Sequence, residues 1–213
     1  MKPKKFYLVS LGCAKNTVDS ESMAQLMGSA GYRPVEKPSK AAVLIVNTCG
    51  FIEAAKQESI DTILELAELK TEQNPKKIIV TGCLAQRYYD ELAHEMPEID
   101  MIVDLSKEFR IGEVLEGRIS GNGAAPSAYR DFTEYPERSL SGLPYAYLQI
   151  ADGCDNRCSY CAIPLIRGEY RSKPIEQVLR EISSQTAEST TATSTSIGKL
   201  AELATQLRKS VTG

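Results

Sequence analysis

The chain has 213 residues, of which 42% are hydrophobic and 25% are charged, so it can bury one sizeable core or two small ones and is not a disordered protein. Its 25 Lys and Arg residues against 28 Asp and Glu residues give a net charge of -3, which excludes a global basic field for holding nucleic acid or an anionic membrane. The longest apolar run, residues 41–46, is far shorter than the roughly 18 to 20 residues that cross a bilayer.

The N-terminal segment faintly resembles a secretion signal, because a basic start is followed by an apolar run that ends in Cys13. That run is only about as long as the shortest signal cores, near 7 residues, and it continues as a plausible first core strand. We therefore expect a cytoplasmic protein. Thiols stay reduced in the cytoplasm, so the six cysteines are expected to be metal ligands or reactive groups rather than disulfides.

From Phe6 to about Gly117 the chain repeats one pattern, in which a short apolar run is followed by a polar turn and an amphipathic helical stretch. The expected strands are residues 6–11, 43–47, 77–81 and 99–103, and the expected helices are residues 20–30, 53–70, 85–95 and 107–116. This order predicts an α/β fold, with a parallel sheet in an N-terminal domain of residues 1–117.

The amino-acid composition of the chain changes after this domain. Residues 118–144 are rich in Gly, Ser and Pro and lack any period, which predicts a linker. A strand at 145–150 and a helix from Pro174 to about Ile182 predict the first βα unit of a second domain at 145–182. Residues 183–213 include 13 Ser or Thr, and their apolar residues recur at helical spacing, so we expect a flexible stretch and then an amphipathic helix.

Three cysteines follow the expected strands of the first domain. Cys13, Cys49 and Cys83 lie 36 and 34 residues apart, close to the length of one strand–helix unit. Successive parallel strands point the same way, so these thiols should meet at the carboxyl edge of the sheet. Strands about 4.8 Å apart let three loops reach one object several ångströms across, such as an iron–sulfur cube. A zinc ion would need a fourth ligand, and three unrelated buried cysteines are the remaining alternative.

The other three cysteines, Cys154, Cys158 and Cys161, lie within eight residues. Three thiolates at this spacing can hold three corners of a 4Fe-4S cube and leave the fourth iron open to a small molecule. A zinc knuckle without its fourth ligand and a redox pair are the alternatives. The only histidine, His94, lies inside an expected helix without a partner motif, and we expect it to be solvated.

These motifs resemble a known family. The Cys154 to Cys161 spacing, with Tyr160 before the last cysteine, resembles the signature of radical S-adenosylmethionine enzymes, and three upstream cysteines on a separate α/β domain narrow the resemblance to the methylthiotransferases. Residues 10–21, 47–52, 56–61 and 81–88 look like the RimO branch of that family. The MiaB branch typically has Gln-Met-Asn after the first cysteine and Ser-Val-Arg after the second, where this chain has Ala-Lys-Asn and Gly-Phe-Ile. The resemblance covers residues 4–182.

The resemblance implies two 4Fe-4S clusters and S-adenosyl-L-methionine as cofactors. The radical cluster would lie on Cys154, Cys158 and Cys161, and an auxiliary cluster would lie on the N-terminal triad. Tyr160 would contact S-adenosylmethionine. A radical cofactor performs the hard step on an unactivated C–H bond, so no catalytic acid or base is assigned.

The same resemblance implies methylthio transfer to the β-carbon of an aspartate in ribosomal protein S twelve of the small subunit, with an electron donor such as flavodoxin or ferredoxin. Neither membrane binding nor direct nucleic-acid binding is expected. Three basic residues after the second triad either face an acidic substrate segment or are ordinary solvated charges; they are Arg167, Arg171 and Lys173.

The family's radical domain is a partial barrel of six βα units followed by a small β-barrel, and this chain supplies about one unit. We therefore expect a form truncated after the start of the radical domain, and an inactive one, since one βα unit cannot close a sheet. A tRNA methylthiotransferase of the MiaB type and a non-catalytic iron–sulfur binding or interaction module are the alternative functions.

Overall fold

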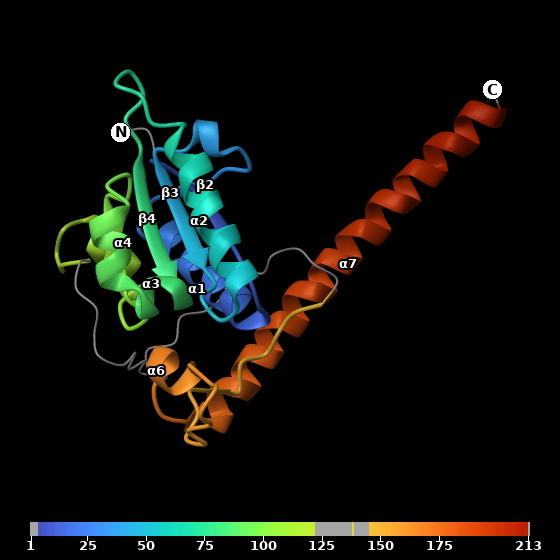
Figure 1. Ribbon diagram of the computed structural model, residues 1–213. Helices are drawn as coiled ribbons and strands as arrows, with labels where there is room; N and C mark the ends of the chain where they lie inside the picture. The colour runs from blue at the N-terminus through green and yellow to red at the C-terminus, as the bar shows by residue number, and fades with distance from the viewer. Residues whose placement is uncertain (1–3, 122–137, 139–144, 213) are drawn as a thin grey trace. The chain divides into compact units, whose positions relative to one another are not determined.

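The computed structural model describes residues 4–121, residue 138 and residues 145–212 (Figure 1). The chain divides into two compact units, residues 1–173 and residues 174–213. The strands and the helices up to α6 belong to the first unit, and α7 forms the second. Over the described ranges, no helix combines the length and the apolar character that a membrane crossing requires.

The first unit is built on a parallel sheet, as the sequence predicts, but the sheet has five strands where four are expected. Its strands are β1 (Lys5–Ser10), β2 (Arg33–Pro34), β3 (Val43–Thr48), β4 (Lys77–Gly82) and β5 (Met101–Ile102), in the order β2-β1-β3-β4-β5. Every residue of the central strand β3 is buried, as is typical of a parallel strand covered on both faces. The edge strand β2 is not predicted from the sequence, because two exposed residues that include a proline show no apolar pattern.

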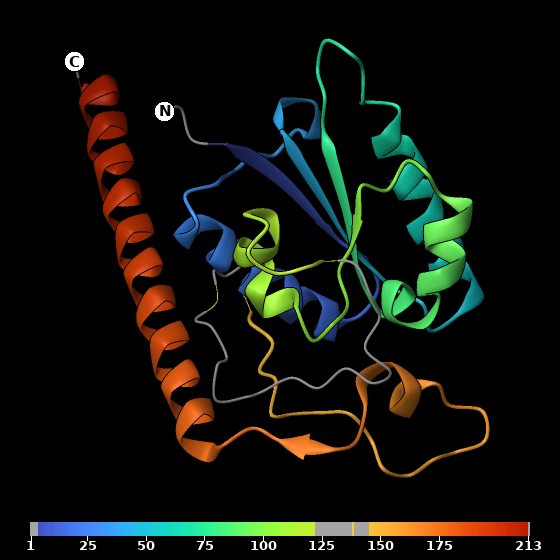
Figure 2. The same cartoon turned by 90° about the vertical axis from the view of Figure 1, so that its left-hand side faces the viewer.

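Helices cover both faces of this sheet (Figure 2). They are α1 (Ala14–Ser29), α2 (Glu53–Ala67), α3 (Cys83–Arg87), α4 (Tyr89–Glu95) and α5 (Ile111–Leu115), with short 3-10 turns η1 (Pro38–Lys40) and η2 (Glu108–Arg110). Helix α1 begins six residues before the expected start at residue 20. The helix expected at 85–95 begins at Cys83 and is interrupted at Tyr88, whose φ of -124° and ψ of 41° lie outside the helical region.

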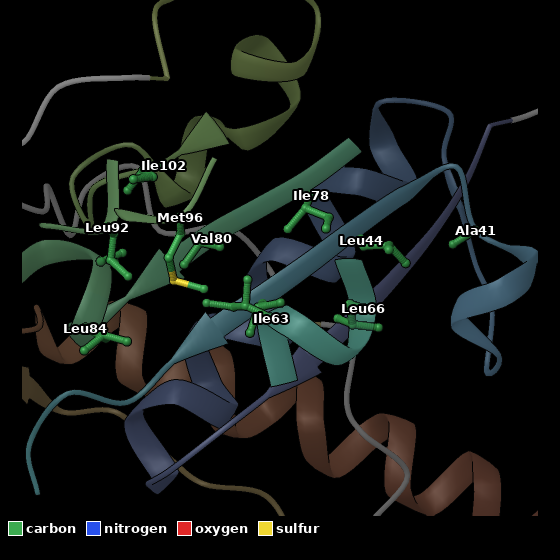
Figure 3. Packing of buried hydrophobic residues seen from close by; sticks show 12 residues of the cluster. Ala41, Leu44, Ile63, Leu66, Ile78, Val80, Leu84, Leu92, Met96 and Ile102 are labelled. Atoms are coloured by element: carbon green, nitrogen blue, oxygen red, sulfur yellow. The ribbon is translucent and has the colours of Figure 1, made fainter. Parts of the chain in front are cut away.

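The core has two layers because successive residues of a strand point to opposite faces. Leu44 and Val46 face a cluster that includes Ile63 and Leu66 of α2, with the residues labelled in Figure 3 around them. The alternate residues of β3 and β4 face a second cluster with residues of α1 and α5; it includes Val43, Ile45, Ile79, Met23, Met27 and Ile111. Full burial of an aliphatic side chain contributes about 1.5–3 kcal/mol, so these layers fix the sheet edge from which the cysteines project.

The segment after the linker differs from its expected form. The strand expected at 145–150 is not formed. Instead, β6 (Ala151–Asp152) pairs antiparallel with β7 (Arg171–Ser172), and α6 (Ile163–Arg167) lies between them in sequence. A strand needs a hydrogen-bonded neighbour, and among the described residues β7 provides one only at these two positions. The partial barrel of the radical domain therefore stays a prediction.

The second unit is one helix, α7 (Ile175–Thr212), which continues well beyond the expected end at Ile182. The flexible stretch expected after that residue is helical instead. Threonine hydroxyls in this stretch donate hydrogen bonds to the backbone carbonyl four residues earlier. Thr186 donates to the Ile182 carbonyl at 2.7 Å, and Thr190 donates to the Thr186 carbonyl at 2.8 Å. Apolar side chains recur along the helix at helical spacing and are exposed; they include Ile197, Leu200, Leu203 and Leu207.

Candidate functional site

The first cysteine triad lies at one edge of the sheet. Cys13 caps the start of α1 directly after β1, Cys49 follows the last residue of β3, and Cys83 opens α3 after β4. These strands are parallel and adjacent, so their carboxyl ends lie together. Cys13 is exposed, whereas Cys49 and Cys83 are buried, and all six cysteines of the chain are free thiols.

One buried amide joins the three cysteine loops. Asn16 Nδ2 donates to the carbonyl of Leu11 at 2.8 Å and to the carbonyl of Thr48 at 2.9 Å. Its Oδ1 accepts from the thiols of Cys13 at 4.0 Å and of Cys83 at 3.8 Å. Since Asn16 is fully buried, these contacts fix the relative positions of the loops that carry the triad.

Glycines allow these loops to approach one another. Gly12 has a φ of +90°, and a Cβ there would lie 2.7 Å from Cys49 Sγ. Gly82 has a φ of +95°, and a Cβ there would overlap the backbone of Thr48. Both glycines come directly before a cysteine, so a side chain at either position would drive two cysteine loops apart.

A hydroxyl group fixes the remaining loop. The backbone N–H of Cys49 donates to Ser59 Oγ at 3.1 Å, and the single O–H of Ser59 lies within hydrogen-bond distance of two carbonyls, that of Ala55 at 2.8 Å and that of Cys49 at 3.2 Å. Ser59 lies on α2 and is fully buried. The helix that covers one face of the sheet therefore also holds the second cysteine in position.

The second triad lines one cavity of about 640 Å³. Cys154, Cys158 and Cys161 share its wall with the turn after α6. The N–H of Cys154 donates to the carbonyl of Gly168 at 3.1 Å, which anchors the loop to that turn. The three cysteines that the sequence predicts as ligands of one cluster thus line the same cavity.

Arg167 is not in either of the two environments expected from the sequence. It is 1% exposed, and its guanidinium lies 3.0 Å from Asp19 and 3.4 Å from Asp152. Its Nη2 also donates to Asn16 Oδ1 at 3.2 Å and to Cys83 Sγ at 3.5 Å. Lys173 is buried as well, and Arg171 is half-buried.

The charges around Cys83 act in opposite directions. Burial raises the pKa of the Cys83 thiol, and the neighbouring Arg167 guanidinium partly offsets this effect. Burial alone would lower the pKa of Arg167, but Asp19 is the strongest of several negative neighbours that raise it well above its ordinary value. Arg167 therefore stays charged beside the thiol.

Tyr160 projects into solvent and is 89% exposed. It borders a cavity of about 650 Å³, together with Cys161 and with Phe51, Lys56 and Arg87 of the first domain. His94 lies on α4 and is exposed, as the sequence predicts.

Within the described part of the chain, no three His, Cys, Asp or Glu side chains are grouped around a point where one metal ion could sit. A zinc ion holds each sulfur at about 2.3 Å, whereas a 4Fe-4S cube spreads its ligands over several ångströms and so does not need that closer grouping. Thiolate is the ordinary donor for such a cluster, and each triad supplies three. By donor type and shared location, the residues fit two clusters.

The sequence points to the six cysteines but misses Asn16, and it points to Arg167 without its buried role. Asn16 and Arg167 are single polar residues in helices, and no periodicity marks them as buried. The available signal is the glycine directly before Cys13 and before Cys83, because a glycine at a strand end indicates close backbone approach.

Comparison with known proteins adds two findings. The family model described as "Uncharacterized protein family UPF0004" matches residues 5–104. The chain is 48% identical over 185 residues to the "Ribosomal protein uS12 methylthiotransferase RimO" of Symbiobacterium thermophilum, covering 84% of this chain and 38% of that protein.

Two further proteins of the same name are similar. The identity is 45% over 180 residues with that of Myxococcus xanthus and 48% over 188 residues with that of Acetivibrio thermocellus. The matches cover 84% of this chain in both cases, and 38% and 41% of the relatives. The chain thus spans about two-fifths of the length of the curated relatives that it matches.

Proposed function

Because the chain belongs to the RimO-type methylthiotransferases, a family of enzymes, we propose that its two cysteine triads each hold a 4Fe-4S cluster for methylthio transfer to ribosomal protein uS12. Cluster binding is proposed for the residues of this chain. Transfer to the β-carbon of an aspartate is proposed as the activity of the complete enzyme, since the chain spans two-fifths of its relatives.

The observation that supports this proposal most strongly is the meeting of three strand-end loops at Asn16. Cys13 and Cys83 both contact its side-chain oxygen, and Cys49 lies against Gly12, next to Cys13. Cys13 and Cys83 are 70 positions apart in sequence, with Cys49 between them, so only the fold brings the three cysteines together.

When bound, the clusters and S-adenosyl-L-methionine supply the radical chemistry that breaks an unactivated C–H bond. The triad of Cys13, Cys49 and Cys83 would hold the auxiliary cluster, and Cys154, Cys158 and Cys161 would hold the radical cluster. Buried Cys49 and Cys83 keep water from the inner side of the first triad. The charge of Arg167 favours the thiolate form of Cys83 that metal binding needs. Tyr160, beside Cys161, is proposed to contact S-adenosylmethionine.

The proposed division into functional domains follows the cysteines. The first triad belongs to residues 1–117, and the second triad belongs to residues 145–182. Residues 118–144 link these two domains, and residues 183–213 form the tail. The compact unit that ends at residue 173 includes both triads, so the boundary at 145 is functional and does not separate compact units. We further propose a cytoplasmic location, where thiols stay reduced, and an electron donor such as flavodoxin or ferredoxin.

Iron stoichiometry tests cluster binding. Anaerobic reconstitution with iron and sulfide is expected to give about eight irons per chain, and about four in either Cys83→Ser or Cys158→Ser. The control His94→Ala changes an exposed residue and should keep about eight. A zinc-loaded, iron-free chain purified without oxygen would contradict the proposal.

Substrate choice tests the activity. The full-length enzyme is offered ribosomal protein uS12 or tRNA with S-adenosylmethionine under reducing conditions. We expect the mass increase of a methylthio group on the ribosomal protein. Modification of tRNA alone would refute the assignment to this branch.

A further inference from the structure

Arg167 connects the second segment, defined as residues 145–173 with the second cysteine triad, to the domain that carries the first triad, through contacts that are distant in sequence. It lies six residues after Cys161, at the end of α6. Its partners Asp19 and Asn16 are on α1, and its partner Cys83 opens α3. One side chain of the second segment thus reaches two elements of the sheet edge that bears the first triad.

Such a charge is buried only where it is paired. Taking a guanidinium out of water costs several kcal/mol unless carboxylates and hydrogen bonds replace the solvent. Asp19 supplies one carboxylate from α1 at 3.0 Å, and Asp152 supplies the other from β6 at 3.4 Å. The guanidinium fork suits this arrangement, because its two nitrogens serve partners on two sides.

Apolar side chains pack against Cys83 beside this contact. Cys83 belongs to a small buried cluster with Leu105, Ala162 and Ile166, the last two of which come from the second segment. Ile166 is fully buried next to Arg167 in sequence. Away from water, a charge 3.5 Å from a sulfur acts more strongly than it would at the surface.

We propose that Arg167 is a positioning residue of the first cysteine centre, which orients Cys83 through its N–H to sulfur contact and clamps the second segment onto the sheet edge. A positive donor at a ligand sulfur stabilises the more negative, reduced form of a cluster, so Arg167 raises the reduction potential of the cluster proposed there. This electrical role rests on the proposed function, whereas the clamp does not.

The clamp is tested on the iron-free chain by hydrogen exchange. Arg167→Met is expected to speed amide exchange in residues 152–168 at least several-fold. The matched control is Arg87→Met, which removes the same charge from the same sheet edge but from an exposed side chain that contacts the Gly50 carbonyl and the Tyr88 ring. Equal exchange in the two variants would overturn the clamp.

The electrical role is tested by redox titration, followed by electron paramagnetic resonance. The background variant has Cys154, Cys158 and Cys161 replaced by Ala, so that only the first triad can bind a cluster. Arg167→Met should shift the potential to a more negative value than Arg87→Met does. Equal potentials would overturn this role, while failure of the parent chain to bind iron would instead refute the proposed function and leave the exchange result to decide on the clamp.

A second set of variants covers the case in which Arg167→Met does not fold. Arg167→Gln combined with Asp19→Asn removes the buried pair as a unit, avoids an uncompensated carboxylate and leaves the net charge beside Cys83 unchanged, so it tests the clamp alone. Faster exchange than in Arg87→Met is expected of it, and equal exchange would overturn the clamp. The potential is then measured on Arg167→Gln alone, which loses only the positive charge; a potential equal to that of Arg87→Met would overturn the electrical role.

Discussion

Asn16 accounts for the hydrogen bonds of two backbone carbonyls, those of Leu11 and Thr48, at the ends of two neighbouring strands. Its amide replaces hydrogen bonds that Leu11 and Thr48 would otherwise make to water. Asn47 adds a second amide, which donates to the Asn16 carbonyl at 2.9 Å and to Ser20 Oγ at 3.0 Å. The position of the first triad therefore depends on buried polar groups as well as on the sheet.

Asn16→Ala is expected to lower the free energy of unfolding by about 2–4 kcal/mol, because each buried carbonyl left without a donor costs about 1–3 kcal/mol. Urea unfolding measures the loss. Gln57→Ala is the matched control, since it removes an amide whose hydrogen bond to Asp61 is exposed. Equal losses in the two variants would mean that the amide at position 16 is not structural.

Gly12→Ala should reduce stability by about 1–2 kcal/mol from the positive φ alone, and its Cβ should also displace Cys49. We expect iron incorporation at the first triad to fall with it, measured as iron per chain. Gly28→Ala is the control, because that glycine lies in α1 with open space around it, and alanine there should stabilise the helix by up to about 1 kcal/mol.

At the scale of the element, apolar periodicity predicts which faces are buried better than it predicts where helices begin and end. Helix α2 buries Ile63 and Leu66 as its pattern indicates. The start of α1 is missed because Lys15, Asn16 and Thr17 give no apolar signal, although tertiary hydrogen bonds make them helical. The interruption at Tyr88 is likewise a packing effect that a propensity pattern does not contain.

Ile63→Ala is expected to cost about 2–5 kcal/mol, because Ile63 is fully buried in the core cluster between α2 and the sheet (Figure 3). The adjacent Leu64 is 43% exposed, so Leu64→Ala should cost less than about 1 kcal/mol. Thermal or urea unfolding of the two variants checks the contrast. Similar losses would mean that α2 is rotated on the sheet.

At the scale of the whole molecule, the parallel sheet and its cysteine edge follow from the repeated βα pattern, and the part after the linker does not. Residues 145–150 have the composition of a strand, but strand formation depends on a neighbour that the described chain provides only at β6. Residues 183–196 have the composition of a flexible segment, yet threonine side chains close onto their own helix. Amino-acid composition alone predicts neither the pairing strand nor these side-chain hydrogen bonds.

The linker residue Arg138 is held to α1 by a buried ion pair with Glu21, at 2.8 Å, and it donates to the carbonyl of Tyr147 at 2.6 Å. Arg138→Met is expected to cost about 3–5 kcal/mol, because it leaves a buried carboxylate without this cation. The double variant with Glu21→Gln should lose less than the sum of the two single losses in urea unfolding. The control Arg118→Met breaks an exposed ion pair with Glu116 and should cost at most about 1 kcal/mol. Equal losses in Arg138→Met and Arg118→Met would mean that the Arg138 pair does not stabilise the fold.

The start of α1 at Cys13 has an electrical consequence of its own. Sixteen residues of aligned peptide groups point the positive pole of their macrodipole at the residue that caps them. A sulfur that becomes negative at this place gains typically about 0.3–1 kcal/mol from that pole, without any cationic side chain. The exposed thiol of the three thus lies at the positive end of a helix, whereas the buried Cys83 thiol lies against a guanidinium.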